Sequence, residues 1–354
     1  MNAKKGYIIG EVAYNHEGDA GVVYRAVEEI AAIGLDAVKF HLLLDASSYL
    51  QKNHPLRPVI GAWMFDEPTW DALLSFTEEK GLDIVALCDD VESIDYLIRS
   101  GRRIRAIEIH ATGINDYFLL EAAARFNGQV VLGISGSTLD EIQYAITFLR
   151  DQGKDDILLM YGFQSYPTDY TRINLAGIAK IRALFGLPVG YADHTGYDDP
   201  NNEIISVMAA MMGVDVLEKH YTPFFGVERV DYHAAVGFEK MQKIRGLFDL
   251  ALTVYGSDAL AMSEAERAYG NTGPMKKAIV AKRPIRKGES LSTDNLWFKR
   301  TVEETYMRQS MFPALIGCVA ARDIDADEII DYSGISYAYR SRSLSDFTHK
   351  RSDE

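Results

Sequence analysis

Short apolar, β-branched runs alternate with amphipathic segments from residue 7 to residue 255. Near-continuous apolar runs of this kind are typical of buried parallel strands. The intervening segments carry the helical period, as at Leu139, Ile142 and Ile146 behind a Thr138–Glu141 capping box. The runs that predict strands are residues 7–12, 36–41, 83–87, 104–110, 129–134, 156–161, 188–192 and 214–218. Eight such units predict a closed (β/α)8 barrel, because a doubly wound open sheet more often stops at about five to seven strands.

Polar and ionisable side chains stand at the ends of these predicted strands. In a (β/α)8 barrel the active site is built at the carboxyl ends of the strands, so we expect these side chains to converge. Two strands end at a histidine beside a carboxylate, and this pattern suggests a metal site. The residues at the eight ends, in chain order, are Glu11; Lys39 and His41; Asp89 and Asp90; Glu108 and His110; Ser135; Tyr161 and Gln164; Asp193 and His194; Glu218, Lys219 and His220.

The pattern changes after the barrel-like part of the chain. We assign residues 1–258 to the barrel and the polar stretch 259–275 to a linker. Residues 276–339 read as a small β-rich domain with turns at Pro284, Gly288 and Asp294. Residues 340–354 are rich in Ser, Arg and Asp and read as a frayed tail.

Composition narrows the class of protein. Hydrophobic residues make up 47% and charged residues 25% of the chain, as in ordinary globular proteins. The formal net charge of −14 argues against nucleic acid or an anionic membrane as partner, since both require a basic surface. No stretch reaches the roughly 20 apolar residues of a membrane span, and no apolar signal segment precedes the first strand. We therefore expect a cytoplasmic protein.

Several motifs carry a family resemblance. The stretches GEVAYNHEGD (10–19), DAVKF (36–40), SYPT (165–168), GYADHT (190–195) and EKH (218–220) resemble the sialic acid synthase (NeuB) family. Residues 278–330 resemble its antifreeze-like SAF domain. The resemblance implies a TIM barrel joined to a SAF domain, in a domain-swapped homodimer where each SAF domain caps the partner's barrel. It also implies condensation of phosphoenolpyruvate with an N-acyl hexosamine or its 6-phosphate, which yields a nonulosonic acid for surface carbohydrate and releases phosphate.

The same resemblance assigns roles to individual residues. It implies that His194 and His220 hold a divalent ion, Mn2+ or Mg2+, which polarises the sugar aldehyde. It implies a catalytic role for Glu11, Lys39 and Glu218, with Lys39 in contact with phosphoenolpyruvate. The residues expected at the substrate are His41, Glu108, Gln164, Tyr166, Asp231 and Arg300.

The phosphate side of the family pattern is altered in this chain. Glu108 stands where the family has a lysine, and Ala192 stands where it has a serine. Gln164 replaces an asparagine and His41 replaces a glutamine. One charge contact at 4 Å amounts to about 4 kcal/mol at an effective dielectric near 20, so exchanging a lysine for Glu108 opposes phosphate binding. Either other cations bind the phosphate, or the donor is not phosphoenolpyruvate. The cations considered are Lys219, Arg102, Arg103 and Arg105.

Alternatives therefore stay open. A divergent family member could act as a metal-dependent aldolase on another sugar or keto acid, or the chain could be a non-catalytic sugar-binding homologue. His194 and His220 could be hydrogen-bonded strand-end residues without a metal, and Lys39 could form an interior ion pair with Glu11 or Glu218. The acidic and histidine residues at strands two to four could line a remodelled pocket or form a solvated rim; they are His41, Asp89, Asp90, Glu108 and His110.

Overall fold

The computed structural model describes residues 6–162, 165, 168–256 and 260–337. The chain divides into two compact units, Met1–Ser257 and Asp258–Glu354, each of which has its own hydrophobic core. No helix in the described ranges combines the length and the hydropathy that crossing a membrane requires.

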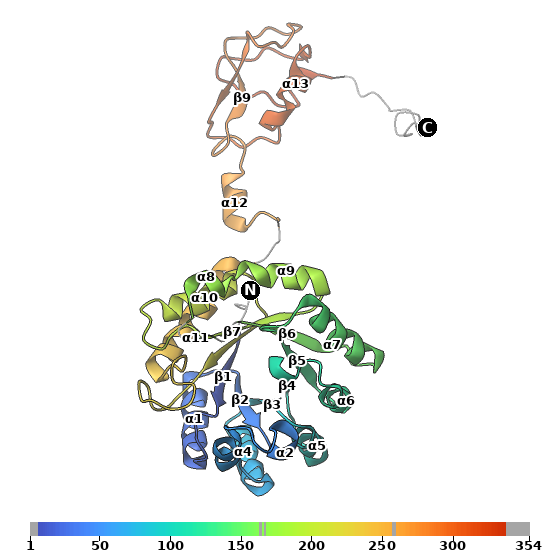
Figure 1. Ribbon diagram of the computed structural model, residues 1–354. Coiled ribbons are helices and arrows are strands. Elements are labelled where there is room, and N and C mark those ends of the chain that lie inside the picture. The colour runs from blue at the N-terminus through green and yellow to red at the C-terminus, as the bar shows by residue number, and fades with distance from the viewer. Residues whose placement is uncertain (1–5, 163–164, 166–167, 257–259, 338–354) are drawn as a thin grey trace, which may run out of the picture. The chain divides into compact units, whose positions relative to one another are not determined.

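The first unit contains the predicted barrel. Its eight strands pair in parallel and in chain order, and β1 also pairs with β8, which closes the sheet. The predicted fold class is thus confirmed, and all eight predicted strands are present. Helices surround these strands in Figure 1. The strands are β1 (Tyr7–Ala13), β2 (Ala37–Leu42), β3 (Asp83–Cys88), β4 (Ala106–Ile109), β5 (Gln129–Gly133), β6 (Ile157–Tyr161), β7 (Val189–Asp193) and β8 (Val216–His220).

Local signals fix the ends of the helices. Helix α1 begins after Asp19, whose carboxylate accepts a hydrogen bond from Gly21, and ends at the left-handed Gly34. The capping box of Thr138 and Glu141 is present at α7, as predicted. The helices are α1 (Ala20–Ile33), α2 (Ala46–Tyr49), α3 (Arg57–Trp63), α4 (Glu67–Glu79), α5 (Val91–Ser100), α6 (Tyr117–Arg125), α7 (Leu139–Asp151), α8 (Tyr170–Ile173), α9 (Ala176–Phe185), α10 (Asn202–Met211) and α11 (Phe238–Tyr255).

Two apolar layers support the barrel. The larger core lies between the strands and the surrounding helices and includes Val38, Ile107 and Leu217. A smaller cluster includes Ile9, Val85 and Met160 from β1, β3 and β6. Because successive strand residues point to opposite faces, the residues two positions after Ile9 and Ala37 also point inward. These two residues are Glu11 and Lys39, so the apolar interior gives way to charged groups toward the strands' carboxyl ends.

The second unit is small and rich in turns. It contains two antiparallel pairs, β9 (Ala278–Ala281) with β10 (Leu296–Lys299) and β11 (Val319–Ala320) with β12 (Ile335–Ser336). Ile279, Leu296, Ile324 and Ile330 belong to its core. The polar stretch read as a linker contains helix α12 (Glu264–Tyr269), which starts with a capping box at Ser263 and Glu266. Helix α13 (Phe312–Leu315) completes the unit.

Candidate active site

The register of the strands places three of the predicted site residues at the same height along the barrel. Glu11 on β1 is the register partner of Lys39 on β2 and of His220 on β8. On β8 the side chains alternate, so Glu218 and His220 both line a cavity at the carboxyl ends of the strands. We call this the axial cavity. Its described lining residues are Glu11, Lys39, His41, Leu87, Glu108, His110, Ala111, Gly133, Ser135, Met160, Gly162, Ala192, His194, Glu218, His220 and Asp231.

Lys39 lies at the centre of a buried cluster of three carboxylates. Its Nζ is 2.8 Å from Glu108 Oε2, 3.0 Å from Glu218 Oε1 and 3.2 Å from Glu11 Oε1. The Lys39 side chain is only 2% exposed. A charge removed from water to this extent needs opposite charges around it, and Lys39 has three. The cluster still carries more negative than positive charge, and His41 Nε2 lies 2.7 Å from Glu11 Oε1 on its outer side.

The cluster separates the pKa values of its carboxyl groups. Burial opposes ionisation of Glu11, but Lys39 and the hydrogen-bonded His41 outweigh it and hold the pKa of Glu11 well below its usual value. Burial raises the pKa of Glu218 well above its usual value, because Glu11 and Glu108 offset the attraction of Lys39. Burial also raises the pKa of Glu108. Two neighbouring carboxyl groups with opposite shifts can act as proton acceptor and proton donor, here Glu11 and Glu218 respectively.

His194 and His220 have the donor chemistry of a divalent metal site. Their rings lie 5.2 Å apart, centroid to centroid, and both line the axial cavity. Burial lowers the pKa of His194 to about 3 and that of His220 to about 4, so both imidazoles are neutral, as metal ligands must be. Glu11 Oε2 lies 3.4 Å from His220 Nε2. In the part of the chain that the structure describes, no group of three or more His, Cys, Asp or Glu side chains is placed to hold a metal together. A metal held by His194 and His220 therefore stays a prediction.

The structure brings most of the predicted site residues together. Glu11, Lys39, Glu218, His194 and His220 all line the axial cavity. Its other predicted members are His41, Glu108 and Asp231. Gln164 and Tyr166 lie outside the described residues. Arg300 belongs to the second unit, where its Nε donates to the Pro274 carbonyl at 2.6 Å, so its contact with the sugar stays a prediction.

The four cations considered for the phosphate do not reach the axial cavity, and that expectation is wrong. Lys219 is completely buried and donates to Asp193 at 2.8 Å. Arg102 pairs with Glu78 at 3.0 Å, and Arg103 pairs with Asp83, the first residue of β3. Arg105 lines a different cavity together with residues at the starts of the strands. Each arginine precedes β4, and so lies at the opposite end of the barrel from the axial cavity.

The acidic and histidine residues of strands two to four have different roles. His41, His110 and Glu108 line the axial cavity. Asp89 accepts a hydrogen bond from the Tyr14 hydroxyl at 3.1 Å, and burial raises the pKa of Asp89 to about 6. Asp90 caps helix α5 through Ser93 N at 2.9 Å. Asp90 is therefore a structural residue and does not line the axial cavity. The spacing Asp-x-x-Ser before an amphipathic segment could have identified it as a helix cap from the sequence.

A buried polar network behind the histidines was not predicted. Asp193 Oδ2 accepts hydrogen bonds from Lys219 Nζ and Ser206 Oγ, and Asp193 Oδ1 accepts from Thr195 N and Oγ1 at 3.0 and 2.6 Å. Asn202 Nδ2 donates to Thr195 O at 2.9 Å. The network joins the ends of β7 and β8 to α10 on the side opposite the axial cavity. It fixes the backbone on both sides of His194 and next to His220.

Comparisons with known proteins agree with this architecture. The NeuB family model matches residues 26–257, and the SAF domain model matches residues 276–336. An uncharacterised protein of Methanocaldococcus jannaschii is 30% identical over 294 residues, which cover 83% of this chain and 84% of that protein. The N,N'-diacetyllegionaminic acid synthase of Campylobacter jejuni is 26% identical over 343 residues, which cover 92% of this chain and 99% of that protein.

A solved structure shows the same fold. The spore coat polysaccharide biosynthesis protein E of Chromobacterium violaceum matches with a TM-score of 0.78 and 23% identity. The match covers 94% of this chain and all of the other chain. The expected combination of a barrel with a SAF domain is thereby confirmed.

Proposed function

Because the chain belongs to the NeuB family and carries a SAF domain, we propose that it is a metal-dependent nonulosonic acid synthase. The proposed reaction joins phosphoenolpyruvate to an N-acyl hexosamine or its 6-phosphate. The observation that carries this proposal is the convergence of Glu11, Lys39 and Glu218 with His194 and His220 in one cavity. The alignment with the N,N'-diacetyllegionaminic acid synthase of Campylobacter jejuni covers nearly the whole of both chains. This similarity supports an N-acyl sugar as the substrate.

The proposed reaction balances in atoms and protons. C3 of the enolpyruvyl group forms a carbon–carbon bond to the aldehyde carbon of the sugar, and water adds to C2. The C–O bond to the phosphate then breaks, so inorganic phosphate and a nine-carbon 2-keto acid leave. A divalent ion held by His194 and His220 would supply Lewis-acid polarisation of the aldehyde.

The chain's own residues handle the protons and the donor. Glu11, whose pKa is held low, is placed to accept a proton from the attacking water. Glu218, whose pKa is raised, is placed to donate a proton to the aldehyde oxygen, and its buried Oε2 has no hydrogen-bond partner among the described residues. Lys39 would exchange one of its three carboxylate partners for the carboxylate of the donor.

One observation favours a second candidate function. Glu108 lies 2.8 Å from Lys39, and this contact leaves the axial cavity with less capacity for a highly charged donor than a lysine in its place would give. Pyruvate carries a single negative charge and no phosphate. In this alternative, Glu11 would remove a proton from C3 of pyruvate, C3 would bond to the sugar aldehyde, and the aldehyde oxygen would gain a proton from Glu218. No phosphate takes part.

A donor exchange tests both candidates. The Mn2+-loaded protein is incubated with a panel of N-acyl hexosamines and their 6-phosphates, with either phosphoenolpyruvate or pyruvate as donor, and mass spectrometry detects the nine-carbon acid. We expect product with phosphoenolpyruvate and none with pyruvate. Product from pyruvate alone would establish the aldol reaction instead. A protein that binds the sugars and turns over neither donor would be the non-catalytic homologue. The variant with both His194→Ala and His220→Ala controls for metal dependence.

A further inference from the structure

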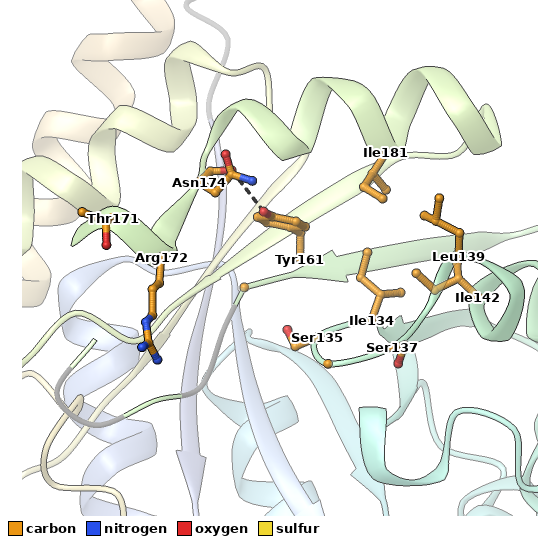
Figure 2. A pocket seen from close by; sticks show the side chains of 12 residues that line it. Ile134, Ser135, Ser137, Leu139, Ile142, Tyr161, Thr171, Arg172, Asn174 and Ile181 are labelled. Atoms are coloured by element: carbon orange, nitrogen blue, oxygen red, sulfur yellow. Dashed lines mark hydrogen bonds between the residues drawn. The ribbon is translucent and has the colours of Figure 1, made fainter. Parts of the chain in front are cut away.

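A second cavity of about 540 Å³ lies beside the axial cavity, bordered by the ends of β5 and β6 and by α7, α8 and α9. We call it the side cavity, and Figure 2 shows it from close by. The two cavities share Ser135 and Gly162. Gly162 has a φ of 151°, and a Cβ there would overlap the Ala192 carbonyl oxygen, so the backbone after β6 can approach β7 this closely only because the residue is a glycine. Through Ser135 and Gly162 the side cavity adjoins the cavity that Glu11 and Glu218 line.

The charges of the two cavities differ. Among the described residues that line them, Lys39 and Arg172 are the only lysine and arginine. Lys39 is already surrounded by three carboxylates. Arg172 is exposed on α8 and makes no hydrogen bond or ion pair with any residue in the described part of the chain. Its electrostatic neighbour Asp169 accepts hydrogen bonds from the backbone and the hydroxyl of Thr171. Of these two cations, Arg172 is therefore the one whose N–H donors are available to a ligand.

The walls of the side cavity are amphipathic. In Figure 2, Arg172 extends from α8 on one side, whereas Leu139, Ile142 and Ile181 group on the other. Ser135 lies between them in the picture and also lines the axial cavity. An anionic group can bind at Arg172 while the carbon skeleton that carries it contacts the apolar wall.

We propose that the side cavity is the site of a phosphomonoester group, bound by Arg172 and displaced from the barrel axis. This inference rests on the proposed function and states where its phosphate binds. A planar guanidinium presents paired N–H donors that match phosphate oxygens, and the exposed edge of Arg172 is free to do so. Among the described lysines and arginines the axial cavity offers such a group only Lys39, whose ammonium already has three carboxyl partners. The phosphate belongs either to the donor or to a 6-phosphorylated acceptor.

Titration calorimetry on the full chain with Mn2+ tests the proposal. The ligands are phosphoenolpyruvate, N-acetylmannosamine 6-phosphate, and their unphosphorylated counterparts pyruvate and N-acetylmannosamine. In Arg172→Ala we expect the affinity for a phosphorylated ligand to fall on the order of 10- to 100-fold, with the unphosphorylated ligands unaffected. In Arg172→Lys, which keeps the positive charge but lacks the paired N–H donors of a guanidinium, the affinity for the phosphorylated ligand should fall less. Arg150→Ala removes an exposed arginine from the far end of α7 and should change nothing.

Comparing the titrations with the two phosphorylated ligands identifies the source of the phosphate. A loss confined to phosphoenolpyruvate assigns the site to the donor, and a loss confined to the sugar phosphate assigns it to the acceptor. If no phosphorylated ligand depends on Arg172, including the case in which none binds, the proposal is wrong. Failure of the phosphate site can be distinguished from failure of the proposed function. Synthase activity that is insensitive to Arg172→Ala would overturn only the phosphate site. Binding of phosphorylated ligands that depends on Arg172, but without turnover, would overturn only the proposed reaction.

Discussion

Glu108 determines the electrostatic character of the axial cavity. It contributes a third carboxylate to Lys39, beside Glu11 and Glu218, and burial keeps all four side chains at 4% exposure or less. The resulting excess of negative charge explains two features. Together with burial and Glu11, it raises the pKa of Glu218, which suits a proton donor, and it disfavours a multiply charged donor at the barrel axis. We therefore predict that Glu108 contributes to the choice of donor.

Replacing Glu108 tests that role. We expect Glu108→Gln to tighten binding of phosphoenolpyruvate about tenfold, because one repulsive carboxylate disappears while the side-chain shape is kept. Calorimetric titration measures the change. Glu121→Gln, an exposed substitution on α6, is the matched control and should have no effect. An unchanged affinity in Glu108→Gln would mean that the donor does not sense this carboxylate.

Asp89 makes a testable contribution to the pH dependence of stability. Burial raises the pKa of this carboxyl to about 6 in the folded protein, with His41, Tyr14, Asp90 and Lys39 as its electrostatic neighbours. A raised pKa means that the folded state binds the proton more tightly than the unfolded state does. The associated stability is therefore full below about pH 4 and is lost as the pH rises to about 6.

The comparison with Asp89→Asn isolates this contribution. Between pH 4 and pH 6 the wild type should lose about 1–2 kcal/mol of unfolding free energy relative to the variant, after allowance for the partial exposure of the side chain. Urea unfolding at a series of pH values measures the difference. Parallel stability curves for the two proteins would show that Asp89 titrates normally.

At the scale of elements, β7 and β8 each present side chains to two faces of the closed barrel. His194 and His220 face the axial cavity, while Asp193 and Lys219 face α10 and form an ion pair with no exposure. Breaking a buried pair by removing one partner leaves an uncompensated charge. The pair therefore holds the two strand ends in register for the histidines.

Substitution of this pair should be costly and non-additive. We expect Lys219→Met to reduce the unfolding free energy by about 3–5 kcal/mol, and Asp193→Asn in the same chain to restore part of it. Chemical denaturation of the single and double variants measures the coupling. Arg125→Met breaks an exposed ion pair with Asp95 and should cost less than about 1 kcal/mol. If Lys219→Met costs as little as Arg125→Met, the pair is not a structural support.

The sequence predicted the elements better than the contacts between them. Buried parallel strands are near-continuous apolar runs, so all eight were visible, and residues at their ends marked the axial cavity. Helix α12 was missed because it spans only six residues and offers little periodicity. The ion pairs of Lys39 with Glu11 and Glu218 were considered from the sequence and are present, whereas its contact with Glu108 depends on strand register between β2 and β4, which no local pattern encodes. Arg102, Arg103 and Arg105 were considered for the phosphate, although they directly precede β4 and so lie at the end of the barrel opposite the axial cavity.

For the molecule as a whole, the expected domain-swapped homodimer predicts that two inactive variants regain activity when they are mixed. If Arg300 of each chain serves the barrel of its partner, chains with Arg300→Ala and chains with His194→Ala plus His220→Ala should both be inactive alone. After equal mixing and subunit exchange, about half of the dimers contain one chain of each kind, and one of the two active sites in such a dimer is intact. About a quarter of the wild-type activity should therefore return. Recovery of no activity in verified mixed dimers would contradict the swap.

The most direct test of the proposed function is the release of inorganic phosphate by the wild-type protein. The assay combines phosphoenolpyruvate, Mn2+ and an N-acyl hexosamine or its 6-phosphate, and omits each component in turn. The account predicts phosphate release that requires all three and disappears when His194 and His220 are both replaced by alanine. Phosphate release that persists without the histidines, or none with any acceptor while the protein still binds Mn2+, would contradict it.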